Sequence, residues 1–452
     1  MKLLLTTMPV HYTCDMISMH TMPSTAIYLL ASILREHGDD VVVLDPFTIR
    51  KSLHQNSEKA FLDLIKVYIN DVDVVCISSN TQNWSMARYA AFKICEIRKD
   101  IDIILGGIHP TYFHEHIIKT TPVKYVIRGE GEKVLPQLIN SIKNKCGFEK
   151  IPGLTWKLKG NVFINPNSTS LLQCDFSTLP LPAYDLMPSG VYRTLPVETS
   201  RGCKFGCKFC SIPRKKDWVG FDAIWASDRI NSIINRYGHM FTKTEVFMTD
   251  DCFTADANRA EQIIENITSC NHELSIAIET RATDLQGSTK NILIRTFAKR
   301  QIVRLATGVE CGYDEGLNRI KKGLTISQLE YLLDLLAKNN LIHKSYYSFI
   351  IGFPWETIDD CLRTIDYAAS IIKRYGMGIV NVNWLRLFPS NIWDERRNYG
   401  IVIDENVFDD HLYHTGKDYF YKAHPNFDES AIRFINKKIE AYGDLGIYLQ
   451  NA

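Results

Sequence analysis

Three cysteines lie within eight residues of one another in the stretch TSRGCKFGCKFCS, residues 199–211. Zinc sites usually take four protein ligands, commonly as two separated pairs, so Cys203, Cys207 and Cys210 would need a distant fourth ligand. A four-iron four-sulfur cluster held by three thiolates leaves one iron without a protein ligand, and that iron can bind a substrate or a cofactor. The spacing favours such a cluster, with a zinc site and a spacing without any ligand role as the alternatives.

The composition is that of a globular protein of roughly two to four domains. The chain has 452 residues, of which 52 are basic and 51 acidic, so its net charge is +1. That balance argues against a nucleic-acid-binding protein. The start MKLLLTTMPV has too short an apolar run for a signal peptide, and no stretch approaches membrane-spanning length. We therefore expect a cytoplasmic protein whose nine isolated cysteines are mostly small buried hydrophobic residues.

The first third of the chain alternates short apolar runs with helical patterns. The runs are rich in β-branched residues, which is typical of strands covered on both faces. One helical pattern follows a predicted N-cap at Ser24 and stops at Gly38. Five strands alternating with helices predict a doubly wound parallel sheet of Rossmann-like type. The five predicted strands span residues 2–7, 40–46, 72–78, 101–107 and 123–130.

A change of texture predicts a boundary between about residues 146 and 194. This connector is rich in proline, glycine and asparagine, with a predicted hairpin around Lys159, Gly160 and Asn161 followed by an irregular strap. The alternation then resumes, and six strand–helix steps could form either an open sheet or a partial barrel. Their predicted strands lie near residues 195–200, 244–251, 274–281, 302–309, 344–352 and 378–387.

The cysteine motif resembles the cluster-binding loop of the radical S-adenosylmethionine superfamily, including the aromatic residue Phe209 directly before the third cysteine. The resemblance implies that Cys203, Cys207 and Cys210 hold a 4Fe-4S cluster. It also implies that the amino and carboxylate groups of S-adenosylmethionine bind the fourth iron. One electron from an external donor such as flavodoxin or ferredoxin would then release a 5′-deoxyadenosyl radical.

Motifs at later strand ends resemble the same superfamily. VFMTDDCFTAD (246–256), IETRATD (278–284), TGVECGYDEGLNRIKKG (307–323) and FIIGFPWET (349–357) follow in the expected order. The family pattern commonly has serine where Cys311 stands, and Phe353 and Trp355 are further departures. By resemblance, the S-adenosylmethionine-binding residues are Phe209, Asp250, Asp251, Glu279, Arg281, Gly308, Glu310 and Gly352.

The first block resembles the cobalamin-binding domain often fused ahead of such barrels. The resemblance rests on the helical pattern that begins Met22-Pro23-Ser24, on GGIHPT (106–111) and on IRGEGE (127–132). Glycines at the carboxyl ends of parallel strands permit close approach of a bulky ligand. The implied cobalamin-binding residues are Thr7, Pro9, Ser78, Ser79, Asn80, Thr81, Asn83, Trp84, Gly106, Gly107, His109, Pro110, Thr111, Arg128, Gly129 and Glu130.

One departure concerns the lower face of the cobalt. Cobalamin domains that supply a histidine ligand use Asp-x-His-x-x-Gly, which the first block lacks, because Gly107 stands where His109 would need an aspartate. We expect cobalt without a histidine ligand, over a surface shaped by the loop SSNTQNW, residues 78–84. His109 as a lower ligand is the alternative to a loop histidine near the corrin edge.

Together the two resemblances imply an N-terminal doubly wound sheet, a partial (β/α)6 TIM-like barrel and a C-terminal helical or aromatic cap. The tyrosine- and phenylalanine-rich tail either covers the substrate or packs against the barrel. The implied segments are a cobalamin-binding domain (1–145), a linker with a hairpin (146–194), a radical S-adenosylmethionine barrel (195–390) and a cap or substrate region (391–452).

The resemblance implies an enzyme that methylates an unactivated carbon of a metabolite, lipid or peptide. A close alternative keeps the cofactors but performs a cyclisation, ring contraction or oxidative rearrangement. A non-catalytic cobalamin or iron–sulfur sensor is the alternative of another class. A methylthiotransferase is disfavoured because residues 1–150 lack a cysteine trio, and no cysteine cluster for an auxiliary iron–sulfur site follows Cys311.

Overall fold

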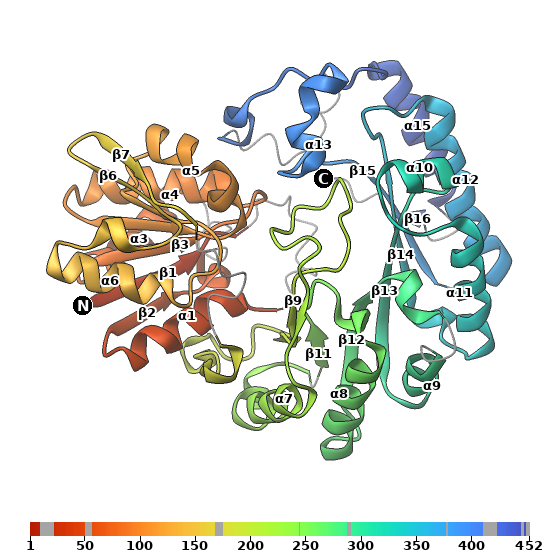
Figure 1. Ribbon diagram of the computed structural model, residues 1–452, viewed down its shortest axis with the longest axis horizontal. Helices are drawn as coiled ribbons and strands as arrows, with labels where there is room; N and C mark the ends of the chain where they lie inside the picture. Colours follow the sequence, from red (N-terminus) through yellow and green to blue (C-terminus); the bar gives the residue numbers. More distant parts are fainter. Residues whose placement is uncertain are drawn as a thin grey trace. The chain divides into compact units, whose positions relative to one another are not determined.

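The computed structural model describes two compact units (Figure 1). Among the described residues, the first unit contains residues 1–192, 239–242 and 404–409, and the rest form the second. None of the described helices combines the length and apolar character that a membrane crossing needs. The description covers residues 1–9, 22–49, 57–167, 175–243, 245–286, 291–376, 378–409, 423–443 and 447–448.

The first unit is built on a seven-stranded sheet in the order β2-β1-β3-β4-β5-β6-β7. Its first five strands pair in parallel, which confirms the predicted doubly wound sheet. Helix α1 packs against α6, and α3 packs against α4. The strands are β1 (Lys2–Thr7), β2 (Asp40–Leu44), β3 (Val74–Ser78), β4 (Asp102–Gly106), β5 (Tyr125–Ile127), β6 (Leu154–Leu158) and β7 (Asn161–Ile164), and the helices are α1 (Thr25–Glu36), α3 (Ser57–Ile69), α4 (Trp84–Ile97), α5 (Ile108–Thr120) and α6 (Val134–Asn144).

Helix α1 has the predicted ends but not the predicted cap. Ser24 occupies the N-cap position with extended backbone, yet its side chain makes no capping hydrogen bond. At the other end Gly38 has a φ of 80°, and its N–H donates to the carbonyl of Arg35. Glycine adopts this left-handed conformation without a steric penalty, so it ends the helix cleanly.

The predicted hairpin extends the first sheet. Strand β6 pairs antiparallel with both β5 and β7. Lys159 and Gly160 at the turn both have positive φ, at 49° and 83°, which is the geometry of a tight two-residue hairpin. Residues 154–164 therefore belong to the first unit and are more than a linker.

The second unit contains a sheet in the order β8-β11-β12-β13-β14-β15-β16, and all its pairs are parallel. Strands that neighbour one another in chain order, with helices along one face (Figure 1), confirm the partial barrel. The strands are β8 (Leu195–Val197), β11 (Glu245–Met248), β12 (Ser275–Thr280), β13 (Ile302–Glu310), β14 (Ser345–Ile351), β15 (Ile379–Trp384) and β16 (Ile447–Tyr448). The helices are α7 (Ala223–Tyr237), α8 (Ala257–Cys270), α9 (Asn291–Lys299), α10 (Asp314–Arg319), α11 (Ile326–Lys338), α12 (Ile358–Tyr375), α13 (Asn391–Asp394) and α15 (Glu429–Glu440).

Side chains of β14 show how this sheet is covered. Tyr347, Phe349 and Ile351 are fully buried, whereas the alternate residues Tyr346 and Ser348 are only partly buried. The sheet thus packs one face against the helices and leaves the other face more open. The seventh strand, β16, comes from the tail and was not predicted. The aromatic stretch HLYHTGKDYFYKAHP spans residues 411–425, and all but its last three residues lie outside the described residues.

Candidate functional site

All three cysteines of the close trio lie in the cysteine loop, residues 198–220, which follows β8. The loop is closed by the short antiparallel pair β9 (Ser200–Arg201) and β10 (Val219–Gly220). The N–H of Cys203 donates to the carbonyl of Arg214 over 3.0 Å, and the N–H of Lys216 donates to that of Phe205 over 3.2 Å. The loop is therefore folded back on itself by backbone hydrogen bonds, which hold the cysteines in place.

Gly202 lies where the two arms of the cysteine loop are close together. Its φ is 78°, and a Cβ there would lie 2.0 Å from the carbonyl oxygen of Asp217. No other residue fits this position without moving the opposite arm. The lack of space for a side chain thus explains why a glycine stands directly before the first cysteine.

The three thiols of the trio differ in burial and in acidity. Cys203 and Cys207 are buried and Cys210 is partly buried. Among the described residues, no three histidine, cysteine, aspartate or glutamate side chains converge on one metal ion. A four-iron cluster does not require such convergence, because each thiolate binds a different iron. A hydrogen bond with the Cys252 thiol also lowers the pKa of Cys203, which favours its thiolate form.

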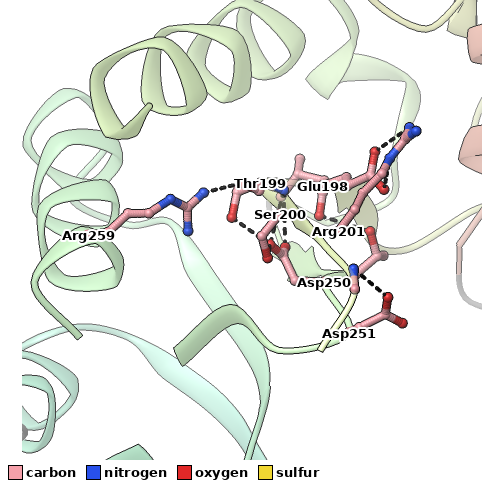
Figure 2. Close-up of polar contacts among 10 residues, drawn as sticks. Glu198, Thr199, Ser200, Arg201, Asp250, Asp251 and Arg259 are labelled. Carbon is pink, nitrogen blue, oxygen red and sulfur yellow. Dashed lines mark hydrogen bonds and ion pairs between the residues drawn. The ribbon is translucent and has the colours of Figure 1, made fainter. Parts of the chain in front are cut away.

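Asp250 and Asp251 hold the first arm of the cysteine loop (Figure 2). The Asp250 carboxylate accepts hydrogen bonds from the N–H and hydroxyl of Thr199, at 3.1 and 2.7 Å, and from the hydroxyl of Ser200. Asp251 accepts from the N–H of Gly202 over 3.0 Å. Burial raises the pKa of both carboxyls. Both predicted residues therefore lie beside the loop, and Asp250 already makes its hydrogen bonds there.

Arg281, at the end of β12, also contacts the cysteine loop. Its guanidinium lies 3.6 Å from the ring centroid of Phe205, and Nη1 is 3.5 Å from the Cys207 sulfur. Nη2 donates to the carbonyl of Lys322. Nε is buried and has no hydrogen-bond partner among the described residues. An orphaned cationic donor beside the thiols fits an anionic ligand such as a carboxylate.

Glu310, at the end of β13, forms a buried ion pair that the sequence did not reveal. The Nζ of Lys322 donates to its Oε1 over 2.9 Å, and both side chains are buried. Glu310 has a φ of 81°, and a Cβ on Gly308 would lie 2.3 Å from the same Oε1. Gly308 therefore makes room for the Glu310 carboxylate. Glu279 on β12 remains exposed, although neighbouring atoms desolvate its carboxyl and raise its pKa.

The loop after β14 is held by a buried carboxyl that was not predicted as a site residue. Oε2 of Glu356 accepts from the N–H groups of Gly352 and Phe353, at 2.6 and 2.9 Å. Oε1 accepts from the Tyr313 hydroxyl at 2.9 Å. Burial raises the pKa of Glu356 to about 7. The ring of Phe353 lies 6.1 Å from that of Phe209, so this loop contacts the cysteine loop.

The tail packs against the same loop after β14. His424 hydrogen-bonds through Nε2 to the carbonyl of Phe353 at 3.1 Å, and its ring stacks on Phe427 at 4.0 Å. Burial lowers the pKa of His424 to about 4, so the ring is neutral near pH 7. Asn426 donates to the carbonyl of Glu356 over 3.0 Å. Residues 424–427 of the tail therefore pack against the barrel.

In the first unit, the predicted cobalamin-binding residues gather at one edge of the sheet. They occupy the carboxyl ends of β1, β3, β4 and β5 and the loops that follow, which are neighbours in the sheet. Asn83 connects two of these loops, because its Nδ2 donates to the carbonyl of Met8 at 2.8 Å and its Oδ1 accepts from the N–H of Asn80 at 2.9 Å. Arg128 donates to the carbonyl of Gly153 and so holds the hairpin.

His109 is enclosed by aromatic rings. It is 1% exposed, its ring stacks on Trp84 at 4.8 Å, and Phe113 and Phe408 also contact it. Its Nδ1 hydrogen-bonds with the Thr81 hydroxyl at 3.2 Å. The His109 side chain is therefore buried among aromatic neighbours. The expectation that cobalt has no histidine ligand stays a prediction.

Two glycines leave space at this edge. A Cβ on Gly106 or on Gly129 would meet no heavy atom within 4 Å, whereas one on Gly107 would lie 2.4 Å from the carbonyl oxygen of Ser79. The Ser85 hydroxyl, at the start of α4, is buried without a hydrogen-bond partner among the described residues. Open backbone and an orphaned hydroxyl fit a bulky ligand with polar edges.

Family models match both halves of the chain. Residues 19–139 match the B12 binding domain, and residues 197–368 match the radical SAM superfamily. The first match contains strands β2 to β5 of the first sheet, and the second contains strands β11 to β14 of the second sheet.

Individual proteins are similar over longer stretches. An uncharacterized methyltransferase of Pyrococcus horikoshii is 28% identical over 82% of this chain and 78% of its own length. An anaerobic magnesium-protoporphyrin IX monomethyl ester cyclase of Rubrivivax gelatinosus is 24% identical over 76% of this chain, which spans 62% of that relative. The radical S-adenosylmethionine methyltransferase TsrM of Kitasatospora setae, solved with tryptophan and a cofactor analogue, shares the fold with a TM-score of 0.67, at 16% identity, over 89% of this chain and 77% of that one.

Proposed function

The chain belongs to the radical S-adenosylmethionine enzymes that carry a cobalamin-binding domain, and from this premise we propose that it methylates an unactivated carbon of its substrate. The observation that carries the proposal is the similarity to a methyltransferase along 82% of the chain. Under this proposal residues 1–145 bind cobalamin, and the hairpin of residues 154–164 extends the sheet of that domain. Residues 195–390 hold the cluster. Residues 391–452 act as a cap or substrate region, except for Glu405–Asp409, which belong to the first unit. The substrate is a metabolite, a lipid or a peptide.

We assign the cluster to Cys203, Cys207 and Cys210. When bound, the cluster and S-adenosylmethionine supply a 5′-deoxyadenosyl radical, and cobalamin carries the methyl group. The protein's contribution is to hold the loop rigid and exclude water. Asp250 and Gly202 support the first arm of the loop, as the contacts above describe. A rigid loop keeps the open iron in one position, where a chelating ligand is bound reproducibly.

For S-adenosylmethionine we propose two groups of residues. Phe209, Asp251, Glu279 and Gly352 lie at loop or strand ends where a ligand could be contacted directly. Asp250, Arg281 and Glu310 are already bound to the cysteine loop or to Lys322, so they would act mainly by positioning. Gly308 would act in the same way, because it leaves room for the Glu310 carboxylate. The free Nε of Arg281 is the exception, since it can still donate to a carboxylate.

For cobalamin we propose the edge formed by β1, β3, β4 and β5. Gly106 and Gly129 would accept the corrin against open backbone, and the Ser85 hydroxyl would donate to one of its polar groups. His109 would support the loop from within its aromatic cage and would not bind cobalt.

The test is an anaerobic reconstitution with iron, sulfide and cobalamin, followed by reaction with S-adenosylmethionine bearing a deuterated methyl group and an extract of the source organism. Methylation predicts equal amounts of S-adenosylhomocysteine and 5′-deoxyadenosine, together with the label in a new product. A variant with all three trio cysteines changed to alanine serves as the control and should form neither. Reconstituted wild-type protein that forms no 5′-deoxyadenosine would contradict the enzyme assignment.

The similarity to a cyclase supports a second candidate, radical cyclisation or oxidative rearrangement without methyl transfer. The same experiment separates the two candidates. Under the second, 5′-deoxyadenosine forms while S-adenosylhomocysteine does not, and no label enters the product.

A further inference from the structure

The cysteine loop has a larger excess of basic over acidic residues than the chain as a whole. The 23 residues from 198 to 220 contain six basic and two acidic side chains, whereas the other residues contain 46 basic and 49 acidic ones. The chain is thus slightly acidic outside the loop and clearly basic within it. The loop's basic residues are Arg201, Lys204, Lys208, Arg214, Lys215 and Lys216.

Only half of these positive charges are neutralised by nearby carboxylates. Arg201 pairs with Glu198 and Arg214 pairs with Asp217, each at 2.9 Å. Lys208 pairs with a more distant residue of the chain, Glu395. The other three basic residues of the loop take no part in these pairs.

The remaining three cations, Lys204, Lys215 and Lys216, have no ion pair within the described part of the chain. Lys204 donates to the carbonyl of Ala255 at 2.8 Å and lies over the Trp218 ring, and Lys215 donates to the Asn391 amide oxygen at 3.0 Å. Neutral partners fix these side chains without cancelling their charge. Lys204 and Lys216 are exposed.

These lysines are directly connected to the residues that hold the cysteines. Lys204 follows Cys203 in the chain, Lys215 forms a backbone bridge with Cys203, and Lys216 donates its N–H to the carbonyl of Phe205. A protein that binds the three ammonium groups would therefore sit against the loop that carries the thiols.

We propose that Lys204, Lys215 and Lys216 form a docking surface for a small acidic electron-carrier protein. The inference rests on the radical function proposed above, because that chemistry needs one electron from outside. Carriers with a thiolate-bound iron–sulfur group are anionic at their redox centre, so a basic surface attracts them in the productive orientation. Charge complementarity of this kind acts mainly on the association rate and is weakened by salt. A net charge of only +1 argues against a nucleic-acid surface.

The test measures cluster reduction, not turnover. Reconstituted protein is mixed anaerobically with a photoreduced acidic ferredoxin in a stopped-flow instrument, and loss of the cluster absorbance is followed at several salt concentrations. The variant is K204E/K216E, and the matched control K338E/K437E changes two exposed lysines on α11 and α15. We expect the second-order rate constant of K204E/K216E to fall at least tenfold at low salt and to lose most of its salt dependence. K338E/K437E should match the wild type.

Two further measurements exclude a damaged cluster as the cause of slower reduction by ferredoxin. Reduction by the methyl viologen radical cation, which a basic surface does not attract, should be at least as fast in K204E/K216E as in the wild type. If charge reversal lowers the iron content, K204Q/K216Q replaces it, with a smaller loss expected. Equal rates with ferredoxin for K204E/K216E and K338E/K437E at every salt concentration would overturn the docking surface. A wild-type protein without a reducible cluster would overturn the proposed function itself.

Discussion

At Gly202 the cysteine loop tolerates no side chain, and this makes the residue a sharp test of the loop. G202A should abolish cluster binding, because its Cβ would have to share the space of the Asp217 carbonyl. Gly190 offers a matched control: it also has positive φ, 73°, but a Cβ there would meet nothing within 4 Å. G190A should cost only about 1 kcal/mol and keep the cluster. Iron content after reconstitution decides between the two outcomes.

Glu356 should make stability depend on pH near neutrality. Its folded pKa, about 7, is above the usual value of 4.5 because the carboxyl is buried. Folding therefore favours the protonated form, and the stabilisation present below the unfolded pKa is lost as pH rises through the folded one. We expect wild-type stability to fall by up to about 3 kcal/mol between pH 4.5 and 8 through this group. Urea unfolding of the wild type and of E356Q across that range measures the effect, since E356Q should not show it. If the stability of the wild type and of E356Q changed with pH in the same way, the raised pKa of Glu356 would be contradicted.

The chemical identity of most candidate residues could be predicted from the sequence, but their contacts could not. Asp250 and Arg281 were predicted to contact S-adenosylmethionine, and both lie beside the cysteine loop. That Asp250 binds Thr199, and that Arg281 stacks on Phe205, depends on how β8, β11 and β12 are placed in the sheet. Residue spacing carries no information on such tertiary hydrogen bonds. Whether these residues also contact S-adenosylmethionine stays a prediction.

Between elements, the ion pair of Glu310 and Lys322 connects the end of β13 with the segment that follows α10. Both side chains are buried, so K322M would leave a carboxylate without a partner, at a cost of roughly 3–5 kcal/mol. The double variant E310Q/K322M should recover most of this loss, because no unpaired charge remains. As a control, R374M removes an exposed pair with Asp334 and should cost at most about 1 kcal/mol. Chemical denaturation of the four proteins checks the order; a K322M as mild as R374M would contradict it.

Elements with a periodic pattern were predicted closely, whereas very short ones were missed. The long apolar runs of β12, β13 and β14 begin and end within a residue or two of the predicted limits. The strands β9, β10 and β16 have two residues each, which is too few to show any alternation. Their existence depends on a neighbouring strand that offers hydrogen bonds. For the same reason the tail strand paired with β15 could not be foreseen.

At the scale of the molecule, the first unit is completed by residues from far along the chain. Asp409 accepts hydrogen bonds from the Trp84 indole at 2.7 Å and from His116 at 3.0 Å, and the ring of Phe408 is fully buried beside His109. Although burial opposes it, these hydrogen bonds lower the pKa of Asp409. The helical segment Glu405–Asp409 is therefore part of the first unit's core.

F408A should accordingly destabilise the first unit. Removing a fully buried phenylalanine ring costs about 3–5 kcal/mol, and the loss should be seen as faster hydrogen exchange in α4 and α5. F434A is the control, because Phe434 is 54% exposed and its removal should leave exchange in both helices unchanged. Unchanged exchange in F408A as well would show that the segment does not support this unit.

Because the segment Glu405–Asp409 comes late in the chain, its contacts with the first unit form late during synthesis. Trp84 and Asp409 are separated by 325 residues, so at usual elongation rates the indole waits on the order of tens of seconds for its acceptor. Nascent chains therefore emerge with the Trp84–His109 cage open to solvent and to chaperones. The contacts of Trp84 and His109 with this segment therefore form only after almost all of the barrel has left the ribosome.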